Sequence, residues 1–411
     1  MVRVCHLSWE YPPAVYGGLG RHVHALAEAQ AALGHDVTVI TDHVPDRPAQ
    51  ESIAGVRILR AAPAPPELPF DTEHLLAWVL ALNHRLAATG IASWQRLRPD
   101  VLHAHDWLVA HAARDLVAID ATPFVATMHA TEAGRHQGWL PTDLSRSIHR
   151  IESWLVASAH RVITCSEHME SEVSRLFDVP NDAMAVIPNG IDTRRWSTPA
   201  RAKRIEPDDP TIVYCGRLEW EKGVHTLLDA VARLRRHYPR LRLVIAGDGS
   251  QRGALVEQAR RRRIATRVTF TGWLPEERLH EVMSAASAVV IPSVYEPFGL
   301  VALEAAALNA PLVVARTGGL TEFADDDSTA ITFTPGAVDD LVHAVRQILD
   351  DPRGATIRAR RARRRLGEHH AWPVIAEATL SVYQQAALHR RRAPVITERD
   401  LTGNLLAQPP G

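Results

Sequence analysis

Short apolar runs rich in strand-forming residues alternate with helical patterns along most of the chain. The first run, "VRVCHLSW", is followed by the helical pattern "HALAEAQAALG" and then by a second run, "HDVTVITD". Alternating strand and helix patterns are typical of βαβ units, in which parallel strands form a sheet that helices cover on both faces. The sequence therefore predicts an α/β protein with doubly wound, Rossmann-like parallel sheets.

The alternation is interrupted at "STPARAKRIEPDDP", which is charged, contains three prolines and has no apolar period. A second series of strand and helix patterns begins after it, at "TIVYCGRL". Because 411 residues are too many for one hydrophobic core, we expect two domains of about 200 residues each. We place them at residues 1–197 and 198–372, facing each other across a cleft, with a helix and a polar tail at 373–411.

The composition is that of an ordinary globular protein, with 46% hydrophobic residues, 23% charged residues and a formal net charge of -1. Such a chain has no overall attraction for nucleic acid or for a membrane. The N-terminus lacks a secretory signal, and no segment approaches about 18 uninterrupted apolar residues. Cys5, Cys165 and Cys215 lie in separate apolar runs, as expected of buried thiols in a reducing compartment. We therefore expect a cytoplasmic protein without a transmembrane segment.

Two arginine-rich runs stand apart from this average composition. They are "ARRRRI" at residues 259–264 and "RARRARRRL" at residues 358–366. Weak contact with an anionic membrane and simple exposure to water are both compatible with these runs. The sequence leaves this point open, together with the oligomeric state.

The motif "YGGLGRH" follows the first predicted strand and begins a predicted helix. Glycines such as Gly17 and Gly18 let backbone N–H groups approach an anion, and the positive end of a helix favours one. The spacing differs from the G-x-G-x-x-G dinucleotide fingerprint. Phosphate binding and a simple tight turn both remain open for this segment.

The motif "YCGRLEWEKG" places Arg217 and Lys222 after the first strand of the second domain. A guanidinium and an ammonium group together suit a diphosphate. Lysine is rare in this chain, since Lys203 and Lys222 are its only two among 46 basic residues. We therefore favour a specific role for Lys222 over that of a solvated loop charge.

The segment "SVYEPFGLVALEAAALNAP" holds Glu296 and Glu304 on either side of a predicted helix start. Pro297 disfavours a helical conformation at Glu296, so the helix is expected to begin near Gly299, with the N–H groups of Gly299 and Leu300 available for a phosphate. Eight residues of helix would separate two carboxylates by about 12 Å, more than the ~5 to 9.5 Å of a glycoside hydrolase pair. We expect Glu296 to bind sugar hydroxyls and Glu304 to bind a ribose. The alternative is a turn acid and a surface helix residue.

Four histidines, His103, His105, His111 and His136, are close together in the sequence and could suggest a metal site. However, the "HAH" pair lies in an apolar strand pattern, which favours packing or hydrogen bonding over zinc binding. The run Asp325 to Asp327 is interpreted as a loop. We therefore predict no metal site.

Six motifs occur in an order that resembles the retaining glycosyltransferases of the GT-B fold, which carry an E-x7-E motif. They are "GGLGRHV", "HAHDW", "VIPNGID", "CGRLEWEKG", "AGDG" and "YEPFGLVALEAAA". The resemblance extends from Val4 to about Tyr383 and is greatest to actinobacterial α-1,4-glucosyltransferases of glycogen and methylglucose lipopolysaccharide synthesis. Classical glycogen and starch synthases carry Lys-x-Gly-Gly-Leu in the first glycine loop. Here Val15 stands at the lysine position, which favours the smaller relatives.

The resemblance implies a site that binds a nucleotide sugar, ADP-glucose or UDP-glucose, without metal or cofactor. In the second domain, the implied residues are Arg217 and Lys222 for the diphosphate, Gly299 and Leu300 for the distal phosphate, Glu304 for the ribose and Glu296 for the transferred sugar. In the first domain, His129 and Asp106 match residues that bind the donor sugar and the acceptor side, and Gly18 would supply a phosphate-binding amide. The C-terminal helix would return to the first domain.

The implied reaction moves glucose onto an α-1,4-glucan or a related oligosaccharide, with same-face attack and retention of configuration. Three alternatives remain open: a phosphatidylinositol mannosyltransferase that uses a GDP-sugar, a nucleotide-sugar epimerase and a non-catalytic carbohydrate-binding protein. A pure binder has no need to neutralise a diphosphate, so Arg217, Lys222 and Glu296 argue against the last alternative. The donor base, the acceptor and the linkage are left open by the sequence.

Overall fold

The computed structural model describes residues 1–65, 68–197, 209–324 and 328–388. These residues form two compact units: unit 1 comprises residues 1–164, 170–187 and 376–388, and unit 2 comprises residues 165–169 and 188–375. Most of the predicted linker, the run Asp325 to Asp327 and the tail after residue 388 lie outside the described residues.

In the described residues of unit 1, eight strands form one sheet in the order β3-β4-β2-β1-β5-β6-β7-β8. Neighbouring strands are parallel, except that β3 runs antiparallel to β4. β5 and β6 are buried along their whole length, as expected of central strands covered on both faces. The strands are β1 (Arg3–Leu7), β2 (Asp36–Thr41), β3 (Gln50–Ile53), β4 (Val56–Arg60), β5 (Val101–His105), β6 (Phe124–Met128), β7 (Arg161–Thr164) and β8 (Met184–Val186).

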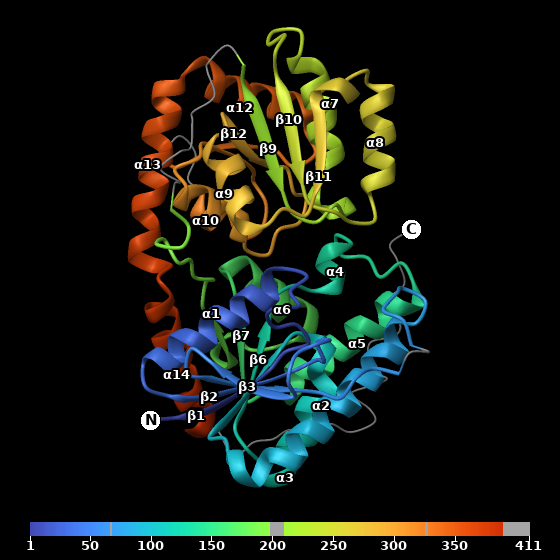
Figure 1. Cartoon of the computed structure of the whole chain (residues 1–411), viewed down its shortest axis with the longest axis vertical. Helices are drawn as coiled ribbons and strands as arrows, with labels where there is room; N and C mark the ends of the chain where they lie inside the picture. Colours follow the sequence, from blue (N-terminus) through green and yellow to red (C-terminus); the bar gives the residue numbers. More distant parts are fainter. Residues whose placement is uncertain (66–67, 198–208, 325–327, 389–411) are drawn as a thin grey trace. The chain divides into compact units, whose positions relative to one another are not determined.

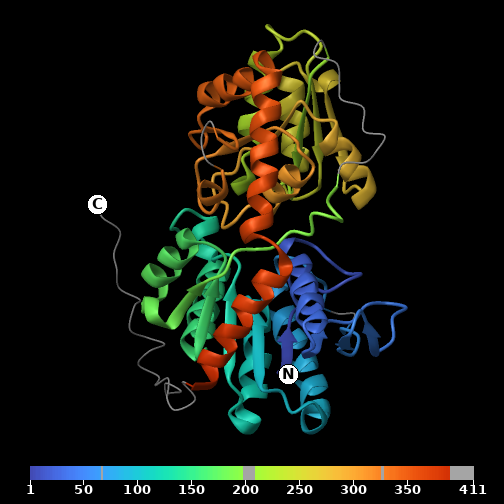
Figure 2. The ribbon, with the colours of Figure 1, turned by 90° about the vertical axis from the view of Figure 1, so that its left-hand side faces the viewer.

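Helices cover both faces of the unit 1 sheet. Figure 1 shows α1 (Gly18–Ala32) and α14 (Trp372–Leu388) on one face, with α2 (Leu75–Leu97), α3 (Ala110–Asp120) and α5 (Asp143–Ser158) on the other. α14 begins in unit 2 and continues across the sheet of unit 1 (Figure 2), where the Tyr383 hydroxyl lies 2.8 Å from Nδ1 of His103. The remaining helices are α4 (Glu132–Arg135), α6 (Glu167–Phe177), η1 (Trp107–Val109) and η2 (Asn181–Ala183).

Within the described part of the chain, α2 is the one helix long and apolar enough to meet the length and hydropathy of a membrane span. Length and mean hydropathy alone do not clearly indicate a membrane span, so α2 does not contradict the expectation of no transmembrane segment. α2 packs against α3 and the β2 strand, and its buried residues include Leu82, Leu86 and Trp94. These contacts account for the apolar residues on its buried side, while Leu80 and Ile91 are exposed.

In the described residues of unit 2, six parallel strands form a sheet in the order β11-β10-β9-β12-β13-β14. Side chains of α7, α8 and α12 pack on this sheet and form a buried apolar core. The two doubly wound parallel sheets confirm the predicted fold class. The strands are β9 (Thr211–Cys215), β10 (Arg242–Ala246), β11 (Val268–Gly272), β12 (Ala288–Ile291), β13 (Leu312–Ala315) and β14 (Ile331–Phe333). The helices are α7 (Val224–Leu234), α8 (Arg252–Arg261), α9 (Glu276–Ser284), α10 (Leu300–Ala307), α11 (Leu320–Phe323), α12 (Val338–Asp350) and α13 (Pro352–His369), with η3 (Trp220–Lys222) and η4 (Ala265–Arg267).

Candidate active site

The strand order of unit 2 changes direction between β9 and β12. From β9 the chain proceeds to β10 and β11 on one side, and β12 then pairs with β9 on the other side. In open parallel sheets, ligands bind beside the carboxyl ends of the strands at such a point. The loop after β9 carries Arg217 and Lys222, and the loop after β12 carries Glu296, so the fold brings the predicted donor-binding residues to one edge.

Lys222 and Glu296 form the central contact of this edge. Nζ of Lys222 lies 2.8 Å from Oε2 of Glu296, and the Ser293 hydroxyl donates to the same oxygen at 3.0 Å. The two charged side chains are only 16% and 15% exposed. A partly buried ion pair of this kind contradicts the alternative in which Lys222 is a solvated loop charge and Glu296 a simple turn acid.

The loops that carry this ion pair are also joined through their backbones. The N–H of Val294 donates to the carbonyl of Glu221 at 2.8 Å. Arg217 lies further out, with its side chain 39% exposed and Nη2 at 3.4 Å from Oε1 of Glu221. The guanidinium of Arg217 is therefore more exposed than the ammonium group of Lys222.

Helix α10 begins where the sequence indicated. Gly299 adopts a positive φ of 99° as its N-cap, and the helix runs from Leu300. Glu304, inside this helix, is 3% exposed. The alternative of a surface helix residue is therefore wrong for Glu304. Its predicted contact with a ribose stays a prediction, as do the phosphate contacts of the Gly299 and Leu300 amides.

A glycine pair after β13 supports the Glu296 loop and was missed at the sequence level. The N–H of Gly319 donates to the carbonyl of Glu296 at 3.0 Å. A Cβ on Gly318, whose φ is 53°, would lie 1.9 Å from that same carbonyl oxygen. Only glycine allows this approach. The signal was present in the sequence as "RTGGL", directly after a predicted strand.

In unit 1, the glycine motif at the start of α1 already holds an anion. The carboxylate of Glu10 accepts hydrogen bonds from the N–H groups of Tyr16, Gly17 and Gly20, at 2.5, 3.1 and 3.1 Å. Glu10 is buried, and that burial raises its pKa although the backbone bonds favour the charged form. Because Glu10 accepts a hydrogen bond from the Gly17 N–H, a donor phosphate would have to displace this carboxylate to bind there, and the predicted donor contact of Gly17 stays a prediction. The role of Gly18 stays a prediction.

His129 and Asp106 meet at the carboxyl edge of unit 1, after β6 and β5. Oδ1 of Asp106 accepts a hydrogen bond from the N–H of His129 at 2.9 Å. Asp106 is 6% exposed, with a positive φ of 62°, and burial raises its pKa to about 6. Asp106 thus fixes the backbone of the loop that carries His129, whose own side chain is half-buried.

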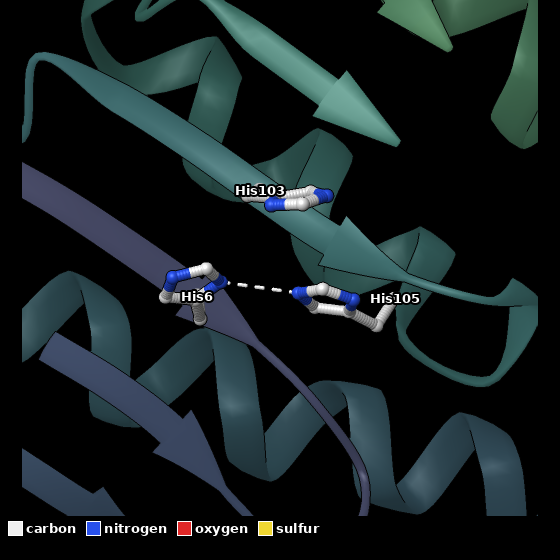
Figure 3. Close-up of side chains that lie close together, drawn as sticks. All are labelled: His6, His103 and His105. Atoms are coloured by element: carbon white, nitrogen blue, oxygen red, sulfur yellow. Dashed lines mark hydrogen bonds between the residues drawn. The ribbon is translucent and has the colours of Figure 1, made fainter. Parts of the chain in front are cut away.

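Of the four histidines that are close together in the sequence, only the two on β5 belong to a spatial cluster. His103 and His105 meet His6 of β1 (Figure 3). His111 packs against Trp154, with ring centroids 5.0 Å apart, and the more exposed His136 lies 3.2 Å from Glu132.

Hydrogen bonds occupy both ring nitrogens of each of the three clustered histidines. His6 contacts His105 at 3.0 Å and Gln30 at 2.8 Å. His103 contacts the hydroxyls of Tyr383 at 2.8 Å and Thr127 at 2.6 Å, and Nδ1 of His105 lies 3.2 Å from Nε2 of His129. A metal ligand needs a nitrogen lone pair directed at the ion. The hydrogen bonds expected for His103 and His105 are present. The ligand atoms of His6, His103 and His105 also lie within 4.8 Å of one another, as do those of His22, His105 and His129, so the absence of a metal site stays a prediction.

An aromatic pocket lies beside the carboxyl ends of β1 and β2 in unit 1. The rings of Trp9 and Tyr16 are stacked, with centroids 5.2 Å apart, while Phe70 and Trp78 pack around Trp9. The cavity measures about 190 Å³, and Asp42 and His43 also line it. Tyr16 and Phe70 are 59% and 51% exposed. Sequence reasoning missed this pocket because its aromatic residues come from three separate segments.

Some of the arginines in the basic runs have partners within unit 2. Arg262 donates to both carboxylate oxygens of Asp229, at 2.8 and 2.9 Å, and Arg365 donates to the carbonyl of Glu322 at 3.0 Å. These contacts show that part of the positive charge stabilises the unit itself.

Known proteins match the chain over nearly its whole length. Residues 198–368 match the family described as "Glycosyl transferases group 1", and residues 16–195 match "Glycosyltransferase Family 4". The chain is 45% identical to a glycogen synthase of Mycobacterium tuberculosis, over 96% of this chain and 98% of the relative. It is 31% identical to a D-inositol 3-phosphate glycosyltransferase of Streptomyces avermitilis, over 92% and 85%. A sucrose-phosphate synthase from Thermosynechococcus elongatus superimposes with a TM-score of 0.81 at 26% identity, over 93% of this chain and 98% of that one.

Proposed function

Because the chain belongs to the group 1 and family 4 glycosyltransferases, we propose that it transfers glucose from a nucleoside-diphosphate-glucose donor to an α-1,4-glucan or a related oligosaccharide. The observation that carries the proposal is the Lys222 and Glu296 ion pair at the β9 and β12 edge. An ammonium group and a carboxylate held together suit a ligand that has a phosphate next to a sugar. The similarity to a glycogen synthase supports glucose as the transferred sugar.

The departing nucleoside diphosphate develops negative charge as its bond to the sugar breaks. Lys222, Arg217 and the first N–H groups of α10 are the groups in unit 2 that can stabilise this charge. Glu296 accepts hydrogen bonds from hydroxyls of the transferred glucose. Since these side chains supply the positive charge, the proposed reaction uses neither a metal ion nor a separate cofactor.

We propose same-face transfer with retention of configuration. The acceptor oxygen forms a bond to the anomeric carbon as the bond from that carbon to the phosphate oxygen breaks. The acceptor proton passes to the departing phosphate, so the step is balanced without a further base. His129, at the carboxyl edge of unit 1, accepts a hydrogen bond from a hydroxyl of the transferred sugar. Asp106 acts through the backbone of His129.

The aromatic pocket of unit 1 is proposed to bind one pyranose ring of the acceptor. A cavity of about 150 Å³ accommodates benzene, so about 190 Å³ suits a six-membered ring with substituents. Exposed faces of Tyr16 and Phe70 can pack against the apolar face of a sugar. Asp42 and His43 provide polar groups for its hydroxyls.

We expect Tyr16→Ala to raise the KM for a short glucan by about two- to twelvefold, the loss of about 0.5–1.5 kcal/mol of aromatic contact. The KM for the donor should not change, because the proposed donor side chains belong to unit 2 and the substitution keeps the backbone N–H of Gly18. Steady-state kinetics with maltooligosaccharides measures both constants. Trp139→Ala is the matched control, since Trp139 is an exposed aromatic residue of unit 1 outside the pocket. An unchanged acceptor KM in Tyr16→Ala would remove the pocket from the acceptor site.

A panel of donors and acceptors tests the function itself. Purified protein is incubated with ADP-glucose, UDP-glucose or GDP-mannose, together with maltooligosaccharides or phosphatidylinositol, and the product linkage is determined. We expect α-1,4-linked glucan from a glucose donor. Mannosylated lipid would instead support the inositol-lipid enzyme, and consumption or epimerisation of the donor without an acceptor product would support an epimerase. A cytoplasmic location is part of the proposal, because nucleotide sugars and glucan would meet the enzyme there.

A further inference from the structure

A continuous chain of hydrogen bonds runs through the core of unit 1 and ends at His129. Oε1 of Gln30, on α1, lies 2.8 Å from Nε2 of His6. Nδ1 of His6 lies 3.0 Å from Nε2 of His105, the contact drawn in Figure 3. Nδ1 of His105 lies 3.2 Å from Nε2 of His129. His6, Gln30 and His105 are fully buried, so water does not compete for these contacts.

A second branch leaves Gln30 in the opposite direction. Nε2 of Gln30 donates to the hydroxyl of Tyr383 at 3.1 Å. That hydroxyl lies 2.8 Å from Nδ1 of His103, and Nε2 of His103 lies 2.6 Å from the hydroxyl of Thr127. Gln30 therefore stands between two branches, and its amide presents an oxygen to one branch and N–H groups to the other.

The imidazoles of this chain, three of them fully buried and that of His129 half-buried, are neutral at physiological pH. Burial lowers the pKa of His6 and of His129 to about 4, and it holds the pKa values of His103 and His105 well below the usual range. A neutral imidazole has one N–H donor and one bare acceptor nitrogen. The direction of one hydrogen bond in the chain therefore sets the direction of the next.

The orientation of Gln30 sets this direction. Because its oxygen faces His6, Nε2 of His6 carries the proton and Nδ1 of His6 is an acceptor. Nε2 of His105 must then donate to His6, and Nε2 of His129 must donate to Nδ1 of His105. In the other branch, the Tyr383 hydroxyl donates to His103, which donates from Nε2 to Thr127.

The direction that this amide orientation implies agrees with the chemistry of imidazole itself. It gives all four histidines the Nε2–H tautomer, which free histidine prefers in water. With the Gln30 amide reversed, the same contacts would need four Nδ1–H tautomers. The intrinsic preference of the four imidazoles for the Nε2–H tautomer and the orientation of the Gln30 amide thus favour the same hydrogen-bond direction.

We propose that Gln30, His6 and His105 are positioning residues that hold His129 as the Nε2–H tautomer with Nδ1 as a bare acceptor. This inference rests on the proposed function in one respect, namely that the bare Nδ1 accepts a hydrogen bond from a hydroxyl of the transferred sugar. Asp106 fixes the backbone of His129, while the buried chain fixes its ring. The ring of His22 packs edge-on against His129, with ring centroids 4.9 Å apart. The hydrogen bond to His105 occupies Nε2 of His129, which leaves Nδ1 as its acceptor nitrogen.

Nitrogen NMR of the full chain labelled with 15N-histidine tests the tautomer directly. Two-bond proton–nitrogen couplings distinguish Nε2–H, Nδ1–H and charged rings, and single substitutions assign the signals of His6, His105 and His129. We expect Nε2–H for all three near neutral pH. An Nδ1–H or charged His129 would overturn the inference.

Two substitutions of His6 separate positioning from packing. In His6→Asn, the side-chain oxygen can take the place of Nδ1 and accept from His105, whereas His6→Leu removes that acceptor. We expect kcat to fall about tenfold in His6→Leu, as when a partner that orients a functional imidazole is removed, with the donor KM unchanged. His6→Asn should retain most of kcat and the Nε2–H signal of His129.

The outcomes distinguish this inference from the proposed function. Equal kcat in the two folded His6 variants, with an unchanged His129 signal in His6→Leu, would reduce His6 to a packing residue and overturn the inference. If no donor in the panel supports sugar transfer, the proposed function fails, while the NMR spectrum still decides the tautomer. A shift of the His129 signal in His6→Leu that His6→Asn prevents supports the positioning role even then.

Discussion

Replacing Lys222 with alanine is expected to slow glucose transfer by about 10²- to 10³-fold, the usual cost of removing one group that stabilises charge on a leaving group. The ammonium group is partly buried and lies 2.8 Å from Glu296. Its removal deletes the positive charge proposed to stabilise the departing diphosphate and leaves Glu296 without this cation. Steady-state kinetics with the best donor gives the change in kcat/KM, and thermal unfolding checks that the variant is folded.

Comparison of Lys222→Ala with Glu296→Ala separates the proposed phosphate contact from the proposed sugar contact. If the lysine contacts phosphate as proposed, Lys222→Ala weakens binding of the free nucleoside diphosphate. If the glutamate contacts the sugar as proposed, Glu296→Ala binds that diphosphate normally and still loses transfer. Titration calorimetry measures both affinities.

A matched control removes a different positive charge from unit 2. Arg346 forms an exposed ion pair with Asp350 at 3.7 Å in the last turns of α12, the end of the helix opposite to the carboxyl edge of the parallel sheet. Arg346→Ala should therefore leave transfer almost unchanged. Normal turnover by a folded Lys222→Ala variant would refute the proposed role of the lysine.

The residues at the β9 and β12 edge were predictable because strand patterns and motif positions are local properties of a sequence. Lys222 and Glu296 each follow an apolar run, and the carboxyl ends of parallel strands lie at the same edge. The sequence also indicated the start of α10, since Pro297 and Gly299 restrict the backbone there. The loops after β9 and β12 meet because these two strands are neighbours in the sheet.

Contacts between distant segments were not predictable in the same way. Tyr383 and His103 are 280 residues apart, and no local pattern indicates that a hydroxyl from α14 reaches β5. The carboxylate that fills the glycine turn comes from Glu10, in a segment that looks like an ordinary loop. A glycine-rich turn predicts an anion, but it does not show whether the protein supplies that anion itself.

His6 should also make the stability of unit 1 depend on pH. Burial lowers its folded-state pKa from 6.5 to about 4. The unfolded chain therefore binds a proton at His6 below about pH 6.5 that the folded chain refuses until about pH 4. The stability associated with neutral His6 is fully present above the unfolded pKa, and it is lost as the pH falls from about 6.5 to about 4.

His6→Asn isolates this effect, because asparagine does not titrate while the other ionisable groups stay in place. Buried acids such as Asp106, whose pKa is raised to about 6, act in the opposite direction but are common to both proteins. We expect the free energy of unfolding of the natural chain to fall relative to His6→Asn by on the order of 3 kcal/mol between about pH 7 and about pH 4. Urea unfolding of both proteins across this range gives the difference. If the difference in the free energy of unfolding between the two proteins did not depend on pH, His6 would take up its proton equally in the folded and unfolded chains. That result is incompatible with a neutral imidazole buried between Gln30 and His105.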